Sequence, residues 1–114
     1  MTTDGMVTDD TIVAISSAVG PAPRMLVRTS GGLSLEAASR LGAKPEAGPT
    51  LQTLHIEQMP VPAVVLAFPA GRSPTGQAVV EYHLPGNPLL CRLVVDALVR
   101  LGCRRAEAGE FTAR

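Results

Sequence analysis

The sequence predicts an α+β fold, in which strands and helices share one small domain. Several short runs rich in β-branched residues, each bounded by Gly or Pro, have the length and composition of strands. Two other segments carry helix-capping residues and helical spacing. The strands and helices do not alternate strictly, so a parallel sheet built from β-α-β units is not expected. The predicted order is strand, strand, helix, three strands, helix and strand.

The predicted strands are apolar or alternating runs that end at turn residues. The first two are separated by a short connection that contains the Gly/Pro segment 20–23, which indicates a hairpin. The run 63–68 is apolar without interruption and is therefore expected to be a buried central strand. The full set comprises residues 11–16, 24–29, 51–57, 63–68, 78–83 and 104–107.

A short helix is predicted between this hairpin and the third strand, over residues 35–41. Ser34 is a suitable N-cap, Glu36 stands in the electropositive first turn, and Gly42 suits the position after the last turn. Two prolines and a glycine follow within residues 43–50, and this composition indicates a loop.

A longer helix is predicted over residues 88–101. Asn87 is a good N-cap, Pro88 suits the first helical position, and Gly102 suits the position past the end. Three charged residues at four-residue spacing form one narrow polar stripe, while nearly all other side chains of the helix are apolar. Such a helix needs cover from more than one layer, so we expect a partner subunit or a second domain to contact it. The stripe consists of Arg92, Asp96 and Arg100.

The composition is that of one domain of ordinary size, with 114 residues of which 46% are hydrophobic and 18% charged. Residues 1–9 are polar and acidic and are expected to be disordered, so the domain spans residues 10–114. Basic and acidic residues balance, and this neutrality argues against direct nucleic-acid binding by the domain alone. The apolar runs are too short for a membrane helix, and we interpret Cys91 and Cys103 as reduced thiols of a cytoplasmic protein.

No catalytic or metal-binding motif is present in the sequence. The chain lacks both the phosphate-binding loop G-x-x-x-x-G-K-[ST] and the dinucleotide fingerprint G-x-G-x-x-G. His55 and His83 stand in different predicted strands without a set of carboxylates, and we interpret them as ordinary strand histidines. No hydroxyl residue has an evident base partner, so the sequence predicts neither catalytic residues nor a metal site.

Two charged residues stand inside otherwise apolar strands. Arg28 follows an M-L-V run, and Glu81 follows V-V and precedes Tyr82. A buried charge is costly without a partner, so two interpretations are open. Either each side chain points to solvent on the outer face of its strand, or both face a ligand pocket. In such a pocket the carboxylate accepts N–H groups and the guanidinium donates to a carbonyl or carboxylate.

Three segments carry a resemblance to a known family. Residues 10–15 read D-T-I-V-A-I, and residues 27–31 read V-R-T-S-G. The segment 68–81 contains F-P-A, S-P-T-G and V-V-E in that order. The segment 101–114 begins with L-G and ends with A-E-A-G-E-F-T-A-R. In this order and spacing, the segments resemble the amino-terminal domain of tRNA-modification GTPases of the MnmE (TrmE) family, over nearly the whole chain.

The resemblance implies a fold and an assembly. In that family the amino-terminal domain is a β(2)-α-β(3)-α unit whose final strand swaps between two subunits. The resulting homodimer resembles the duplicated folate-binding domain of the glycine-cleavage aminomethyltransferases. The chain is then a fragment, or a stand-alone relative, of a longer GTPase, and it has no complete active site of its own.

The resemblance also implies a function. Full-length family members hydrolyse GTP and work with the flavin-dependent MnmG (GidA) protein to add an aminomethyl-type group to the wobble uridine of certain tRNAs. The one-carbon unit comes from a tetrahydrofolate derivative, 5-formyl- or 5,10-methylene-tetrahydrofolate, which the amino-terminal domain holds. Arg28 matches the arginine of the family's R-I-S-G motif, and Glu81 matches its strand glutamate; both are associated with the folate.

Alternatives come from three segments that depart from the family pattern, at residues 20–25, 77–78 and 84–87. The family has G-R-G-G-x-G, E-D and G-H-G-G there, whereas this chain has G-P-A-P-R-M, Q-A and L-P-G-N. These changes favour a second hypothesis, a dimerisation or interaction domain of the same fold that has lost folate binding. A third hypothesis, an aminomethyltransferase-like enzyme, predicts a duplicated and much longer chain.

Overall fold

The computed structural model describes residues 10–16, 24–71, 76–107 and 109–110. The predicted disordered segment 1–9 and the Gly/Pro segment 20–23 lie outside these residues. The described chain has the predicted α+β fold and the predicted order of elements, with a short 3-10 turn, η1 (Pro45–Ala47), in addition. None of its helices is long and apolar enough to cross a membrane.

Six strands form a single sheet in the order β3-β4-β5-β2-β1-β6. Neighbouring strands run antiparallel except β6, which runs parallel to β1. The predicted hairpin of the first two strands is confirmed, with Ile12 opposite Ser30 and Ser16 opposite Leu26. The strands are β1 (Ile12–Ser16), β2 (Arg24–Ser30), β3 (Thr50–Ile56), β4 (Met59–Phe68), β5 (Val79–Pro85) and β6 (Arg104–Arg105).

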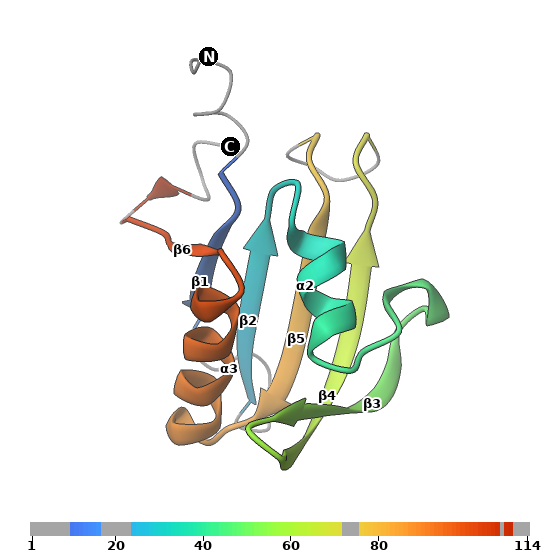
Figure 1. The fold of residues 1–114 in the computed structure, drawn as a ribbon, viewed down its shortest axis with the longest axis vertical. Helices are drawn as coiled ribbons and strands as arrows, with labels where there is room; N and C mark the ends of the chain where they lie inside the picture. Colours follow the sequence, from blue (N-terminus) through green and yellow to red (C-terminus); the bar gives the residue numbers. More distant parts are fainter. Residues whose placement is uncertain (1–9, 17–23, 72–75, 108, 111–114) are drawn as a thin grey trace.

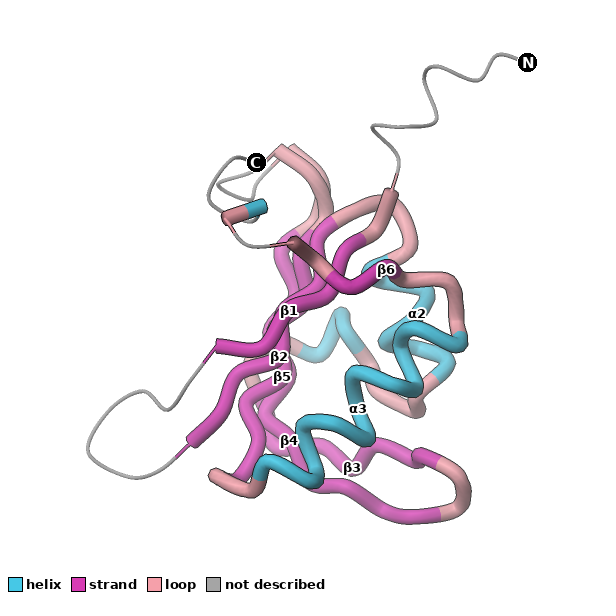
Figure 2. Tube along the Cα trace, turned by 90° about the vertical axis from the view of Figure 1, so that its left-hand side faces the viewer, coloured by secondary structure: helices cyan, strands magenta, loops and turns pink. Residues whose placement is uncertain are grey.

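Two helices, α2 (Ser34–Arg40) and α3 (Pro88–Arg100), cover the same face of the sheet (Figure 1). Seen along its edge, the sheet forms one layer and the helices form the other (Figure 2). The core lies between these layers, where aliphatic strand residues meet small and aliphatic helix residues. Among the described residues, the opposite face of the sheet carries no helix (Figure 2). We call it the helix-free face.

Helix α3 begins where the sequence predicts and ends within one residue of the predicted end. The Asn87 side chain accepts a hydrogen bond from the Leu89 backbone N–H (2.9 Å), as an N-cap does. Gly102 follows the last turn with a φ of 117°, a conformation that favours glycine. The side chains buried on the inner side are Cys91, Val94, Val95, Ala97 and Leu98.

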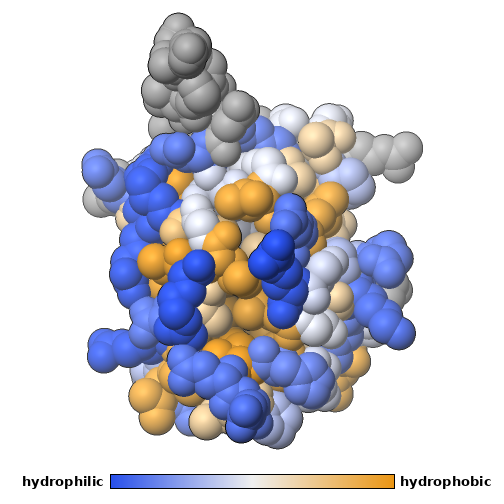
Figure 3. Space-filling view, in the orientation of Figure 1, coloured by the Kyte–Doolittle hydropathy of each residue, from blue (hydrophilic) through white to orange (hydrophobic). Residues whose placement is uncertain are grey.

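The outer side of α3 carries both the polar stripe and apolar surface. Arg100 donates a hydrogen bond to Glu57 (2.7 Å), and Asp96 accepts one from Arg105. Hydrophobic surface shows between hydrophilic side chains on the helix-bearing face (Figure 3). The sheet alone therefore buries one side of the helix, and cover of the remainder by a partner stays a prediction. The exposed or half-buried apolar residues of α3 are Leu89, Leu90, Leu93 and Val99.

The predicted N-cap of α2 is wrong. The helix begins at Ser34 itself, so Leu33 occupies the N-cap position without a side-chain cap. The Ser34 hydroxyl is buried and has no hydrogen-bond partner among the described residues. The Leu33 backbone N–H donates instead to Oγ1 of Thr11 (2.8 Å), just before β1. The hydroxyl that serves this helix start thus comes from another part of the fold, which no local pattern reveals.

Strand β4 is longer than predicted and is not buried on both faces. It begins at Met59, and its first residues pair with β3 alone, where the two prolines of this stretch are tolerated. Ala63 and Val65 are buried against the helices, whereas Val64 and Leu66 are half-buried on the helix-free face. The uninterrupted apolar run therefore reflects two apolar faces, only one of which the helices cover.

Strand β6 is shorter than the predicted strand 104–107 and pairs with β1 of the same chain. The Arg104 backbone N–H donates to the Thr11 carbonyl (2.8 Å), and that of Ala106 donates to the Val13 carbonyl (2.9 Å). Beyond Val13, β1 has no neighbouring strand on this side among the described residues. The strand swap between two subunits stays a prediction.

Candidate functional site

The register of β2 and β5 places Arg28 directly opposite Glu81 on the helix-free face. Nε and Nη2 of Arg28 donate hydrogen bonds to the same carboxylate oxygen, Oε2 of Glu81, at 2.9 and 2.6 Å. The side chains are 39% and 15% exposed, respectively. The two charged residues that stand out in the sequence, 53 positions apart, therefore form one half-buried ion pair.

His83 completes a cluster of three side chains around this carboxylate. Alternate residues of a strand share a face, so His83 follows Glu81 along β5. Its Nε2 lies 3.3 Å from Oε1 of Glu81. We call Arg28, Glu81 and His83 the Glu81 cluster. The interpretation of His83 as an ordinary strand histidine missed this contact, although its position two residues after Glu81 in an apolar strand was a sign of it.

Apolar residues of the flanking strands surround the Glu81 cluster. Leu66 lies opposite Glu81 on β4, and His83 lies between Val64 of β4 and Leu26 of β2. Leu26 is buried, and the two β4 residues are half-buried. Charged groups interact more strongly in such low-polarity surroundings than in water. The cluster is therefore a small charged area within an apolar sheet face.

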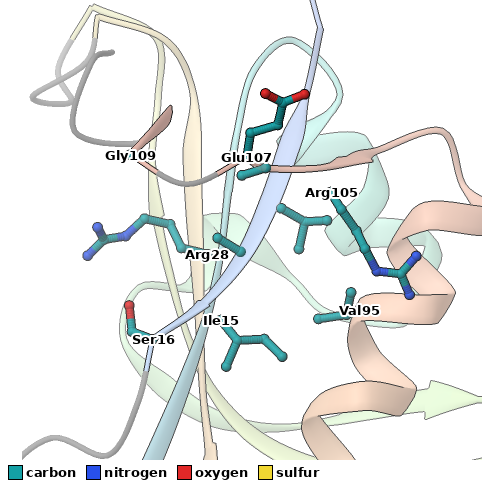
Figure 4. A pocket seen from close by; sticks show the side chains of 10 residues that line it. Ile15, Ser16, Arg28, Val95, Arg105, Glu107 and Gly109 are labelled. Atoms are coloured by element: carbon teal, nitrogen blue, oxygen red, sulfur yellow. The ribbon is translucent and has the colours of Figure 1, made fainter.

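A pocket of about 470 Å³ opens beside Arg28, along the part of β1 that β6 leaves unpaired. Arg28 reaches out on one side of β1 and Arg105 on the other, while Ile15 and Val95 lie between β1 and α3 (Figure 4). The walls come from β1, β2, α3, β6 and the segment after β6. Glu81 does not line this pocket, so Arg28 is the residue that joins the Glu81 cluster to it.

The pairing of Arg28 with Glu81 bears on both interpretations of the sequence. Each charge already compensates the other, so the pair needs no ligand to be stable on the sheet. A ligand that binds either side chain replaces part of the ion pair between Arg28 and Glu81. The pair thus provides an acceptor and a donor that are held in place by two adjacent strands.

The two thiols are buried, and their environment does not activate them as nucleophiles. Cys91 is 0% and Cys103 4% exposed. Burial raises the pKa of both thiols, that of Cys103 to about 11, so both are protonated and weakly nucleophilic near neutral pH. In the part of the chain that the structure describes, no three His, Cys, Asp or Glu side chains gather in an arrangement suited to a metal ion.

The described part of the carboxyl-terminal segment is linked by a side-chain hydrogen bond to Asp10, just before β1. Arg104 donates to both carboxylate oxygens of Glu110 (3.2 and 2.6 Å) and to Oδ2 of Asp10 (3.2 Å). The hydrogen bond to Glu110 is the main cause of a raised pKa for Arg104. Oε1 of Glu110 also accepts from the Glu107 backbone N–H (2.9 Å). Residues 111–114 of the motif lie outside the described residues.

Comparison with known proteins identifies the family of this chain. A family model described as "GTP-binding protein TrmE N-terminus" matches residues 11–114. Proteins named tRNA modification GTPase MnmE are 36% identical in Rhodopirellula baltica and in Francisella philomiragia, and 33% identical in Wolinella succinogenes. The alignments cover 93%, 96% and 100% of this chain but only 25–26% of the relatives' length. The chain therefore belongs to the family of amino-terminal domains of the MnmE (TrmE) tRNA-modification GTPases.

Proposed function

We propose that this domain binds a tetrahydrofolate derivative and forms a homodimer in the service of tRNA modification. The relatives are named as tRNA modification GTPases, and the chain spans about a quarter of their length. GTP hydrolysis, a partnership with the flavin-dependent MnmG (GidA) protein, action on the tRNA wobble uridine and a cytoplasmic location are accordingly proposals for a whole protein. The part proposed for this domain is to hold the folate that supplies the one-carbon unit.

The observation that carries the folate proposal is the Glu81 cluster beside a pocket. The pterin ring of a folate presents adjacent N–H groups, and a carboxylate has two oxygens to accept them. Arg28 brings a guanidinium to the pocket wall, where it suits a carbonyl or carboxylate of the ligand. The pocket volume of about 470 Å³ lies within the usual range of small-molecule sites.

The observation that supports a homodimer is the open edge of β1. Beyond Val13 no described strand pairs with this edge, and the Ile15 side chain is 45% exposed. An unpaired edge with an exposed apolar side chain is a place where another strand adds to a sheet. We propose that the carboxyl-terminal strand of a second copy pairs here, which also brings apolar cover to the neighbouring α3.

A second candidate function is a dimerisation or interaction domain of the same fold that has lost folate binding. The completeness of the Arg28–Glu81 ion pair favours it, because neither charge requires a ligand. The segment 84–87 favours it as well. Pro85 has no N–H to donate to a ligand, and the side chain of Asn87 is engaged as the cap of α3.

Isothermal titration calorimetry with 5-formyltetrahydrofolate separates the two functions. We expect the wild-type domain to bind, and Arg28→Ala or Glu81→Gln to weaken binding by at least about tenfold, because each removes a charge-assisted contact. Arg24→Ala is the matched control, since it removes the same charge from an exposed position on the same face of β2. Thermal melts of all variants establish that they are folded. Absence of heat from the wild-type domain at saturating ligand leaves the second function.

A further inference from the structure

The two oxygens of Glu81 are not equally open to a ligand. A carboxylate oxygen has two lone pairs, and those of Oε2 receive Nε and Nη2 of Arg28 at 2.9 and 2.6 Å. Oε1 faces Nε2 of His83 at the longer distance of 3.3 Å. A ligand N–H group that binds this carboxylate therefore displaces a weaker contact at Oε1 than at Oε2.

The proton on Nε2 of His83 determines whether Oε1 is engaged. When Nε2 carries a proton it donates to Oε1, and a fully protonated imidazole adds the attraction of opposite charges. When the neutral ring carries its proton on Nδ1, the lone pair of Nε2 faces the lone pairs of Oε1 and the contact is lost. Oε1 of Glu81 is then free to accept a hydrogen bond from a ligand.

Among the described residues, the charged groups nearest to His83 in the strand pairing belong to two strands. Glu81 precedes it on β5, and Arg24 and Arg28 flank its opposite residue on the same face of β2. The β4 residues nearest to it in the pairing are apolar, with Val64 directly opposite. Both helices lie across the sheet, on the other face (Figure 2). Protonation of His83 therefore acts on the carboxylate that it touches.

We propose that His83 is a positioning residue that makes ligand binding at Glu81 depend on pH. Protonated His83 holds Oε1 by a charged contact and competes with the ligand, whereas neutral His83 offers at most an uncharged hydrogen bond, which its Nδ1–H tautomer lacks. This inference rests on the proposed folate binding and applies to the class of nitrogen heterocycles that present adjacent N–H groups to a carboxylate.

Calorimetric titrations with 5-formyltetrahydrofolate near pH 8 and near pH 6 test the proposal. The wild-type domain is expected to bind about fivefold more weakly at the lower pH, where the ligand displaces a charged contact. His83→Phe has no donor and is expected to bind equally well at both pH values. His83→Gln keeps a donor that does not titrate and is also expected to show no pH dependence. His55→Gln, which removes the chain's other histidine from an exposed position, is the control that keeps the wild-type dependence.

Nuclear magnetic resonance of the imidazole groups gives a second readout besides the measured affinity. Near pH 6, addition of ligand is expected to shift the imidazole signals of His83 and to leave those of His55 unchanged. Equal pH dependence in the wild type and both His83 variants overturns the role of His83 while folate binding stands. Absence of binding by every variant at both pH values overturns the role of His83 together with folate binding.

Discussion

At the scale of single residues, Gly31 fills the tightest position between β2 and α2. Its φ is +142°, and an added Cβ would lie 2.5 Å from both Cα and Oγ1 of Thr11. The same Oγ1 accepts the hydrogen bond from the start of α2, so a side chain at residue 31 disturbs the turn and the cap together. The fold therefore requires glycine at this position of the R-T-S-G motif, whether or not a ligand binds.

We expect Gly31→Ala to lower the free energy of unfolding by at least about 2 kcal/mol, from backbone strain and overpacking together. Gly32→Ala is the matched control, because an added Cβ there meets nothing within 4 Å. It is expected to change stability by less than about 1 kcal/mol. Urea denaturation measures both variants, and equal stabilities would contradict the close approach to Thr11.

The raised pKa values of Cys103 and Tyr82 predict that the domain loses stability at high pH. Burial raises the pKa of the Cys103 thiol from 9.0 to about 11, and burial, with Cys103 nearby, raises the pKa of Tyr82. The unfolded chain therefore loses these protons first. The contribution of Cys103 to the free energy of unfolding is complete below about pH 9 and declines between about pH 9 and pH 11.

Cys103→Ala is expected to flatten this alkaline decline, by up to about 2 kcal/mol between the two ends of the window. Urea denaturation near pH 8 and near pH 11 measures it. The difference between the two pH values is the readout, since the substitution also leaves a small cavity that lowers stability at every pH. The same decline in wild type and variant would show that Cys103 ionises alike in the folded and unfolded chains.

At the scale of elements, the sequence predicts those features that depend on residues close together in the chain. Helix α3 carries its start and stop within the segment, at Asn87 and Gly102, and its boundaries were predicted closely. The start of α2, in contrast, is capped by Thr11, whose hydroxyl accepts a hydrogen bond from the Leu33 N–H 22 residues later in the chain. The Glu81 cluster likewise depends on the pairing register of β2 and β5, which local patterns do not contain. Single charged residues in apolar strands were visible in the sequence, whereas their mutual contact was not.

The turn between β3 and β4 places two non-glycine residues in the left-handed region. Glu57 has a φ of 51° and Gln58 a φ of 67°. Two-residue hairpin turns of this kind favour Asn or Asp followed by Gly. Glu57 is also engaged in the ion pair with Arg100, which ties the turn to α3. Residue 58 is therefore the position at which the strain is relieved most simply.

We expect Gln58→Gly to raise the free energy of unfolding by about 1 kcal/mol, because glycine adopts a positive φ without steric cost. Gln58→Ala is the matched control, since it removes the same side chain but keeps the Cβ that makes this conformation unfavourable. Thermal unfolding of the two variants measures the difference. A glycine variant no more stable than the alanine variant would mean that the turn carries no such strain.

At the scale of the whole molecule, the helices that the structure describes cover one face of the sheet only. The helices enclose the core on that face (Figure 2), while the Glu81 cluster and apolar side chains of β4 lie on the other face. The pocket beside Arg28 meets the open edge of β1 at the same place. A second copy that adds a strand at this edge therefore approaches the proposed ligand site as well, so dimerisation and ligand binding are expected to depend on each other.

Dimerisation is expected to depend on Ile15, whose side chain is 45% exposed on the open edge of β1. Ile15→Asp places a charge where the partner strand would pack, so we expect the dissociation constant of the dimer to rise by at least about tenfold in sedimentation equilibrium. Met59→Asp is the matched control, because Met59 is also 45% exposed but lies at the start of β4, beside the β3–β4 turn. A wild-type domain that stays monomeric at every concentration contradicts the dimer. Equal weakening by both variants places the interface away from the β1 edge.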